Sequence, residues 1–258
     1  MTEKKSYLFL VGLVSLVYAN VYLNSFHFDD LTAILQKPWV RGLDKIPMFL
    51  FSFSQRPLVI LSFNLNYYIS EFQVWSYHLF NIGFHAIAVC LVYRLALEIS
   101  VLSGHSDLLS NRRNGFLAAT LFAIHPLNTQ AVTYISSRSS IMATWCYLAA
   151  TIFLLNGYGA RKDILEKKSK SENKRLSGSI SFILSFMCLF FGILCKEIVV
   201  TFPAIAFLAH FLFVSQYSVV DWIRQNFRII CVVALCLILL LIGILFLKKN
   251  ILEMYPTS

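Results

Sequence analysis

Charged side chains are scarce in this chain of 258 residues: Asp, Glu, Lys and Arg together make up only 14% of it. A soluble domain carries about 25%, and hydrophobic residues reach 58% here. This number of charged residues is too small to cover a surface exposed to water. We therefore expect much of the surface to contact lipid. The apolar stretches are continuous rather than alternating, which disfavours a transmembrane barrel. The composition therefore predicts an all-α integral membrane protein, a polytopic helical bundle in contact with the lipid bilayer.

Several functional motifs are missing as well. The chain has no GxGxxG, Walker, HExxH or nucleophile-elbow motif, which argues against phosphate-loop nucleotide chemistry. Its six cysteines lie in or beside apolar segments, at no metal-ligand or disulfide-framework spacing. His78 and His85 share a helix face, but no second helix offers a matching pair. We therefore predict no metal site from these residues, and we attribute the net charge of +9 to membrane topology rather than to a nucleic-acid partner.

Seven apolar segments are candidate membrane spans, given that about 20 residues cross the hydrocarbon core. They cover residues 7–25, 76–97, 115–125, 139–156, 178–195, 198–214 and 228–247. The third is too short to cross alone and ends at His125-Pro126, so we expect it to stop inside a protein-lined cavity. The fifth and sixth together are too long for one crossing, so the chain should reverse near Lys196-Glu197. We expect residues 1–258 to form a single membrane domain.

The basic loop within residues 160–177 is the strongest topological signal, since positively charged loops stay in the cytoplasm. The first span, within residues 1–25, has no cleavage site and is expected to be a signal anchor with a cytoplasmic N-terminus. The loop of residues 26–75 then lies outside the cytoplasm, with an interfacial helix at 46–53, and residues 76–214 hold spans two to six. Lys248 and Lys249 conflict with this topology, because they would lie outside the cytoplasm after the seventh span. Either the last span is misassigned or the chain is part of a longer one.

Four groups of polar residues fall on the outer side: Asp29-Asp30, Arg56, the segment 125–138, and Lys196-Glu197. Charges at membrane depth are costly and usually mark a pathway or a site. Adjacent carboxylates can supply a general base together with a group that orients it or binds a metal. The alternative is a helix cap, in which Asp30 accepts N–H groups of the following LTAIL turn. The sequence leaves both readings open.

Arg138 and Lys196 are the cations best suited to a phosphate, because arginine gives planar bidentate contacts and lysine a point charge. The alternative for each is snorkelling to the lipid headgroups. His78, beside Trp75 and Tyr77, is either an interfacial residue or one that lines the site. We expect the acids and the cations to gather in one chamber that opens away from the cytoplasm.

Five sequence blocks resemble the membrane part of the TMTC-type proteins, the transmembrane and tetratricopeptide-repeat proteins, which are related to protein O-mannosyltransferases in the GT-C superfamily. The blocks are, in order, FHFDD at 26–30, RPLVILSFNLNYYI at 56–69, YHLFNIGFHAIAVCLVYRL at 77–95, LFAIHPLNTQAVTYISSR at 121–138 and LCKEIVVTFPAI at 194–205. The resemblance covers about residues 7–214 and implies a GT-C-like fold. It also implies transfer of a sugar, such as mannose, from a polyprenyl- or dolichyl-phosphate carrier to a protein or glycan acceptor on the outer face.

The resemblance further implies roles for individual residues. Asp29 or Asp30 takes the place of the acidic motif in the first outer loop, as a catalytic base or acceptor-orienting group, with a divalent cation at this pair as an option. Arg138 and Lys196 would bind the donor phosphate. The residues expected to line the site are Arg56, His78, His125, Gln130 and Glu197.

Two departures from the family pattern bear on function. Gln130 stands where the cadherin-directed animal branch has glutamate and agrees with bacterial relatives, which favours a bacterial inner membrane over an endoplasmic reticulum membrane. Glutamine cannot act as a base, so more of the chemistry falls to Asp29-Asp30. The chain also ends at Ser258 without the further spans and repeats of the family. It is therefore expected to be the catalytic portion of a glycosyltransferase, a portion that needs a partner membrane chain, or a non-catalytic assembly subunit with a truncated GT-C fold.

Overall fold

The computed structural model describes residues 2–41, 56–105, 107–165 and 176–213, together with residues 224 and 227. Every regular element in these ranges is helical. The chain divides into two compact units, residues 1–209 and 210–258. The described part of the second unit consists of residues 210–213, which end helix α9, and the two single residues. The predicted interfacial helix at 46–53 and the predicted last span at 228–247 lie outside the described residues.

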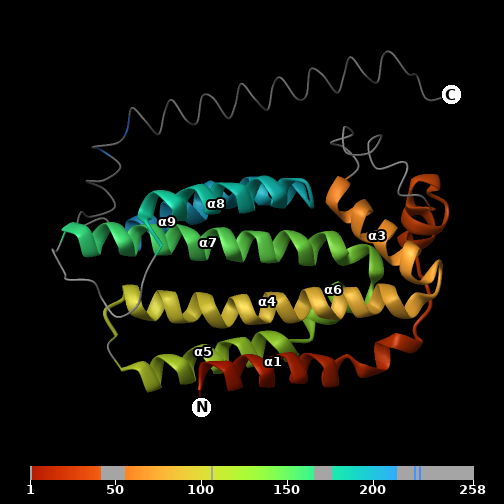
Figure 1. Cartoon of the computed structure of the whole chain (residues 1–258), viewed down its shortest axis with the longest axis horizontal. Coiled ribbons are helices and arrows are strands. Elements are labelled where there is room, and N and C mark those ends of the chain that lie inside the picture. Colours follow the sequence, from red (N-terminus) through yellow and green to blue (C-terminus); the bar gives the residue numbers. More distant parts are fainter. Residues whose placement is uncertain are drawn as a thin grey trace. The chain divides into compact units, whose positions relative to one another are not determined.

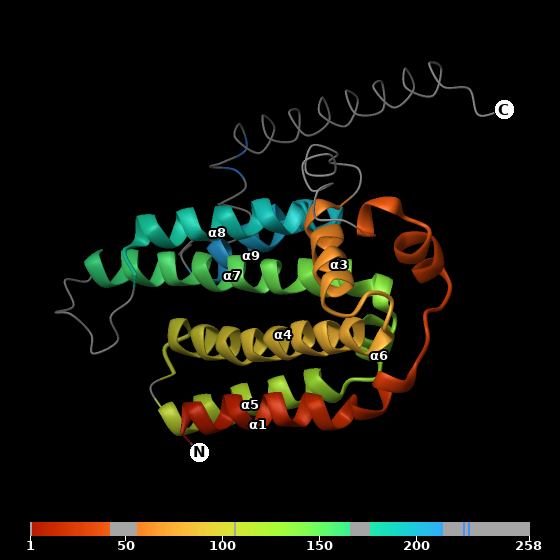
Figure 2. The ribbon, with the colours of Figure 1, turned by 45° about the vertical axis from the view of Figure 1, so that its right-hand side comes forward.

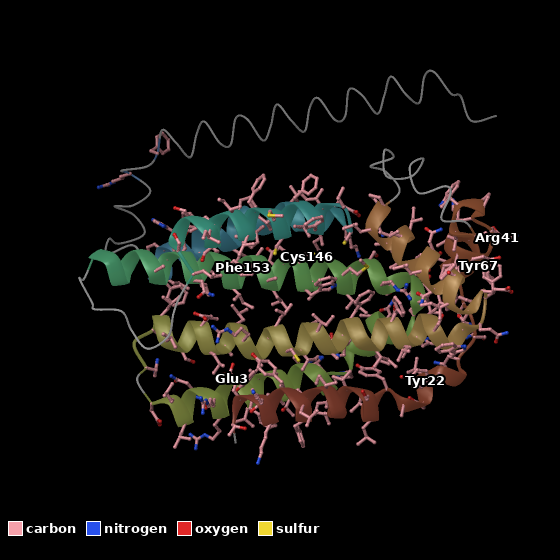
Figure 3. The ribbon with its side chains drawn as sticks, viewed as in Figure 1. Glu3, Tyr22, Arg41, Tyr67, Cys146 and Phe153 are labelled. Carbon is pink, nitrogen blue, oxygen red and sulfur yellow. The ribbon has the colours of Figure 1, made fainter. Side chains whose placement is uncertain are left out.

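Five long helices form the body of the first unit (Figures 1 and 2). They are α1 (Glu3–Val17), α4 (Val74–Leu102), α5 (Leu108–Ile124), α7 (Arg138–Leu165) and α8 (Gly178–Ile193). Helix α4 packs against α1, α5 and α7, and α7 packs in turn against α8. Side chains fill the space between α4 and α7 (Figure 3). The all-α class expected from the composition is confirmed.

Local sequence explains where several of these helices begin and end. Asp107 precedes α5 and accepts a hydrogen bond from the backbone N–H of Leu109, an N-cap contact. Helix α5 ends at Ile124, because His125 precedes Pro126 and adopts an extended conformation. Pro57 occupies the first turn of α3 (Pro57–Ser70), where its missing N–H costs nothing.

Two helical segments in the described part of the chain are long and apolar enough to cross a membrane, Val74–Leu102 and Ile135–Ala160. They match the second and fourth predicted spans. The segments Gly178–Ile193 and Glu197–Phe213 are apolar but shorter. The first predicted span is not one continuous α-helix, since α1 ends at Val17 and a 3₁₀ helix, η1 (Ala19–Leu23), follows. The seven-span count and the GT-C architecture therefore stay predictions.

Short elements cluster at the end of the first unit where α4 and α7 begin (Figure 1). They are η2 (Leu31–Leu35), η3 (Pro38–Arg41), α3, α6 (Leu127–Thr133), η6 (Ile135–Ser137) and η7 (Glu197–Thr201), and α9 (Phe202–Phe213) follows η7. The break expected near Lys196-Glu197 is present between α8 and η7. Two expectations need correction: residues 57–70 form a helix within the predicted outer loop, and α7 continues to Leu165, into the predicted basic loop 160–177.

Candidate functional site

A pocket of about 340 Å³ lies among these short elements and brings together charged residues that are far apart in the sequence. Its charged lining residues are Asp29, Lys37, Arg56 and Lys196. The remaining lining residues are Ala33, Trp39, Val59, Ile60, Phe63, Tyr134, Ser136, Ser137, Ser139 and Ser140. Three cations against one carboxylate give this lining a positive balance, which suits an anion. Of the residues predicted for the site, Asp29, Arg56 and Lys196 thus share one pocket.

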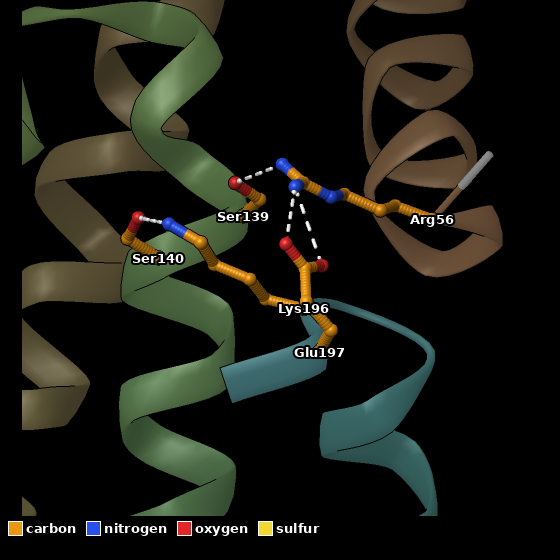
Figure 4. A network of polar contacts seen from close by, with 5 residues as sticks. All are labelled: Arg56, Ser139, Ser140, Lys196 and Glu197. Atoms are coloured by element: carbon orange, nitrogen blue, oxygen red, sulfur yellow. Dashed lines mark hydrogen bonds and ion pairs between the residues drawn. The ribbon is translucent and has the colours of Figure 1, made fainter. Parts of the chain in front are cut away.

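Two of the three cations predicted for the site, Arg56 and Lys196, line the pocket and are held by hydroxyl and carboxylate groups (Figure 4). The Arg56 guanidinium pairs with Glu197 at 3.0 Å and donates to Ser139 Oγ at 3.2 Å. Lys196 Nζ donates to Ser140 Oγ at 2.7 Å. Arg56 has a φ of 50°, in the left-handed region, just before Pro57. Such strain in a non-glycine residue is common at functional sites.

The adjacent aspartates have separate roles in the structure. Asp30 is 1% exposed, and one carboxylate oxygen accepts from the Ser136 N–H at 2.8 Å and from the Ser136 hydroxyl at 2.5 Å. The other oxygen accepts from the His27 N–H at 3.1 Å. The capping alternative is wrong, because the Asp30 side chain makes no cap hydrogen bond to the LTAIL turn. Asp30 ties residues 27–30 to the segment before α7, whereas Asp29 is exposed and lines the pocket.

The position of Asp29 is set by its neighbours Phe28 and Tyr134. Phe28 has a φ of 49° and is 86% exposed, and its ring meets that of Tyr134 edge-on, with centroids 6.4 Å apart. The Asp29 N–H donates to the Tyr134 hydroxyl at 2.9 Å. Desolvation raises the pKa of Tyr134, and the Asp29 carboxylate adds to this increase. The phenol is therefore neutral at neutral pH and can donate a proton in a hydrogen bond.

Arg138 lies beneath the pocket wall rather than in its lining. The residue is 0% exposed, between Ser137 and Ser139, which do line the pocket. Its guanidinium donates to Asn81, Ser62 and Asn66 side chains and to the Tyr77 carbonyl. All these acceptors are neutral, so the charge is held by hydrogen bonds and by a contact with the Phe63 ring at 4.5 Å.

Four other predicted site residues do not line the pocket: His78, His125, Gln130 and Glu197, whose carboxylate pairs with Arg56. His78 is buried on α4, with Nε2 3.3 Å from the Asn24 carbonyl oxygen. His125 is exposed, and its Nδ1 accepts from the Leu127 N–H at the start of α6. Gln130 is exposed on α6. The carboxylate oxygens of Asp30 are already used by the chain, and the described ranges contain no group of three or more His, Cys, Asp or Glu residues able to hold a metal ion.

A second pocket, of about 370 Å³, has an apolar lining and uses the same segments of the chain. It is lined by Leu58, Leu61, Ser62, Leu65, Phe80, Phe84, Met142, Trp145, Cys146, Ala149, Cys188, Phe191 and Cys195. Neighbouring residues therefore serve the two pockets: Ser140 and Met142 on α7, and Cys195 and Lys196 after α8. A charged pocket and an apolar one are thus formed by the same part of the fold.

Sequence reasoning did not single out Lys37, Trp39 or Tyr134. Tyr134 lies near the end of the block LFAIHPLNTQAVTYISSR that was used for the family resemblance, so its place beside the serines was a signal that could have been followed. Lys37 and Trp39 lie in the outer loop outside every recognised block. Their place in the pocket follows from the short helices η2 and η3, which have no clear periodic pattern.

Comparison with known proteins identifies protein O-mannosyl-transferases among the relatives of this chain. The chain is 30% identical over 169 residues to the human protein O-mannosyl-transferase TMTC3, which covers 60% of this chain and 17% of the relative. It is 30% identical over 241 residues to Drosophila melanogaster Tmtc2, covering 88% of this chain and 23% of the relative. It is 28% identical over 239 residues to human TMTC4, and this match covers 84% of this chain and 30% of the relative.

The matched region spans between 17% and 30% of the length of these relatives. No protein-family model matches the chain, and no solved structure matches it. The sequence similarity nevertheless extends over most of the chain and agrees with the resemblance expected from its five sequence blocks. This chain is therefore a homologue of the TMTC-type protein O-mannosyl-transferases.

Proposed function

We propose that this chain is a membrane glycosyltransferase that uses the charged pocket to transfer mannose from a polyprenyl-phosphate carrier to a hydroxyl group of a protein acceptor. Mannose and the protein acceptor follow from the names of the relatives. The carrier and the outward-facing location follow from the GT-C resemblance and from the predicted topology.

One observation carries the proposal: the positively charged pocket adjoins, along the chain, an apolar pocket formed by α3, α4, α7 and α8. A lipid-linked sugar needs both environments, since its phosphate is anionic and its polyprenyl chain is apolar. Lys196 and Arg56 would contact the phosphate, because both line the charged pocket and both are held by serine hydroxyls. The buried charge of Arg138 would add to the positive field without touching the donor.

The chemistry of the proposed step needs one base and a stabilised leaving group. Asp29 is the exposed carboxylate of the pair and would accept the proton of the acceptor hydroxyl. The hydroxyl oxygen then bonds to the anomeric carbon, and the bond from that carbon to the phosphate oxygen breaks. The electron pair leaves with the polyprenyl phosphate, whose charge Lys196 and Arg56 stabilise. A single displacement of this kind inverts the anomeric configuration.

The proposal is tested by transfer of radiolabelled mannose from polyprenyl-phosphate mannose to a threonine-containing peptide, with the full chain in nanodiscs. Asp29→Asn is expected to lower transfer on the order of 10²-fold or more, because it removes the base. Asp107→Asn is the matched control, since asparagine also serves as an N-cap. Equal activity in Asp29→Asn and the wild type would refute the assignment of Asp29 as the base.

The assembly-subunit alternative makes a different forecast for the same protein. It expects no transfer by the wild-type chain, and it expects the Asp29→Asn variant to lose co-purification of another membrane chain. Transfer by the wild type that is lost in Asp29→Asn would refute it.

A further inference from the structure

We infer that Tyr134 is a positioning residue for Asp29 and that a chain of hydrogen bonds links it to the buried Arg138. The inference rests on the proposed function, because it assigns a task within the same pocket. Four observations support it: the backbone contact to Asp29, the free donor capacity of the phenol, the anchoring of Tyr134, and the strain at Phe28.

The contact to Asp29 joins residues 105 positions apart in the sequence. The Asp29 N–H donates to the Tyr134 hydroxyl oxygen at 2.9 Å, and in the described part of the chain this N–H has no other acceptor. Both residues line the charged pocket. The hydroxyl therefore fixes the backbone of the residue whose carboxylate we propose as the base.

The phenol retains a donor after making this contact. A tyrosine hydroxyl can accept one hydrogen bond and still donate its own proton. That proton is available to the Asp29 carboxylate or to a pocket ligand. Tyr134 can thus hold the backbone and orient the side chain of Asp29 at the same time.

Tyr134 is itself held by buried residues on the protein side of the pocket wall. Its carbonyl accepts from Asn81 Nδ2 at 3.3 Å, and Asn81 Oδ1 accepts from Arg138 Nε at 2.7 Å. Asn81 and Arg138 are both fully buried. A buried hydrogen-bond network therefore connects Arg138 to Tyr134, which lines the pocket. Arg138 does not line the pocket itself, but it helps to position Tyr134 through Asn81.

Strain at Phe28 shows that the segment before Asp29 is constrained by its surroundings. A bulky residue at positive φ costs free energy and persists only where neighbouring contacts fix the backbone. The exposed Phe28 ring buries little surface that could compensate, so hydrogen bonds of the neighbouring residues hold the segment. They include those of Asp29 with Tyr134 and of Asp30 with Ser136 and His27. The hydrogen bond of the Asp29 N–H to Tyr134 thus helps to keep the preceding residue, Phe28, at its positive φ.

Tyr134→Phe tests the inference, because it removes only the hydroxyl and keeps the ring contact with Phe28. We expect kcat for mannose transfer to fall on the order of 10²-fold, as is typical when a reacting group is misplaced by about 1 Å. The KM for the donor should change by less than about twofold, because the phosphate contacts remain. Tyr68→Phe is the matched control: Tyr68 is 76% exposed on α3 and is not part of the pocket lining.

Hydrogen exchange of the Asp29 amide gives a second readout that does not depend on activity. We expect about fivefold faster exchange in Tyr134→Phe, the change that follows from loss of one ordinary hydrogen bond, and no change in Tyr68→Phe. Unchanged exchange with an unchanged kcat would overturn the inference. If the wild type transfers no mannose but the exchange difference is present, the proposed function fails and the positioning of Asp29 by Tyr134 stands.

Discussion

Replacing Arg138 with lysine tests whether the buried guanidinium organises the wall of the pocket. The side chain is fully buried and makes four hydrogen bonds, to Asn81, Ser62, Asn66 and the Tyr77 carbonyl. Lysine keeps the charge, but its single nitrogen cannot reach acceptors on both sides of a planar guanidinium. We expect Arg138→Lys to lose at least two of these four hydrogen bonds.

The magnitude follows from these lost bonds. A hydrogen bond to a charged group contributes about 1.5 to 3 kcal/mol, so two lost bonds give a loss of about 3 kcal/mol or more. Each kcal/mol shifts the unfolding midpoint by about 2 to 4 °C in a chain of this size, so the midpoint should fall by roughly 6 to 12 °C or more. Removal of the charge in Arg138→Met should cost about as much, because the polar partners stay buried.

Thermal unfolding of the chain in one detergent, followed by intrinsic tryptophan fluorescence, measures this shift. Arg113→Lys is the matched control, because Arg113 is exposed on α5 and its replacement should change the midpoint by no more than about 1 to 2 °C. A midpoint for Arg138→Lys within the range of the control would refute the reasoning, since it would mean that the four hydrogen bonds contribute little to stability.

Two further predictions concern packing and pH. A Cβ added at Gly157 would lie 2.7 Å from the Phe182 ring, so Gly157→Ala should lower stability by about 1 to 3 kcal/mol. Gly83→Ala meets no atom within 4 Å and should raise it by about 0.5 to 1 kcal/mol; equal midpoints for the two variants would contradict this packing. The pKa of Glu197 is lowered by a hydrogen bond from the backbone N–H of Glu197 and by the nearby Arg56. The ionised carboxylate therefore stabilises the folded chain at pH values above its unfolded pKa. This contribution is lost as the pH falls through the lowered pKa of the folded state. Glu197→Gln should therefore be slightly less stable than the wild type at neutral pH and equal to it in acid; denaturation at both pH values checks this, and a difference that persists in acid would count against it.

The sequence predicted the helical class and part of the helix set well, because long, continuous apolar stretches are typical of helices. The segments 76–97 and 139–156 lie within α4 and α7, and the break after α8 falls near Lys196-Glu197 as expected. Helix α3 was missed, because three prolines and mixed polarity made residues 31–75 resemble a loop. Its fourteen residues are stabilised by packing against η3, α4 and α7, which no local pattern reveals.

The sequence predicted three of the residues that line the pocket and little of the pocket's geometry. Charge and loop position pointed to Asp29, Arg56 and Lys196, and these three line one pocket. They could not show that Asp30 is buried against Ser136, or that Arg138 points into the protein rather than into the pocket. Adjacent aspartates are identical as sequence. Only the tertiary contacts of each carboxylate distinguish the buried, anchoring Asp30 from the exposed Asp29.

The claim that this pocket holds a lipid-linked phosphate is tested most directly by equilibrium binding of polyprenyl phosphate to the full chain. We predict that Lys196→Gln binds it about 10-fold or more weakly than the wild type, since one charge-assisted hydrogen bond is lost. Lys5→Gln, at an exposed position on α1, should bind as the wild type does. Equal affinity of Lys196→Gln and the wild type would contradict the account.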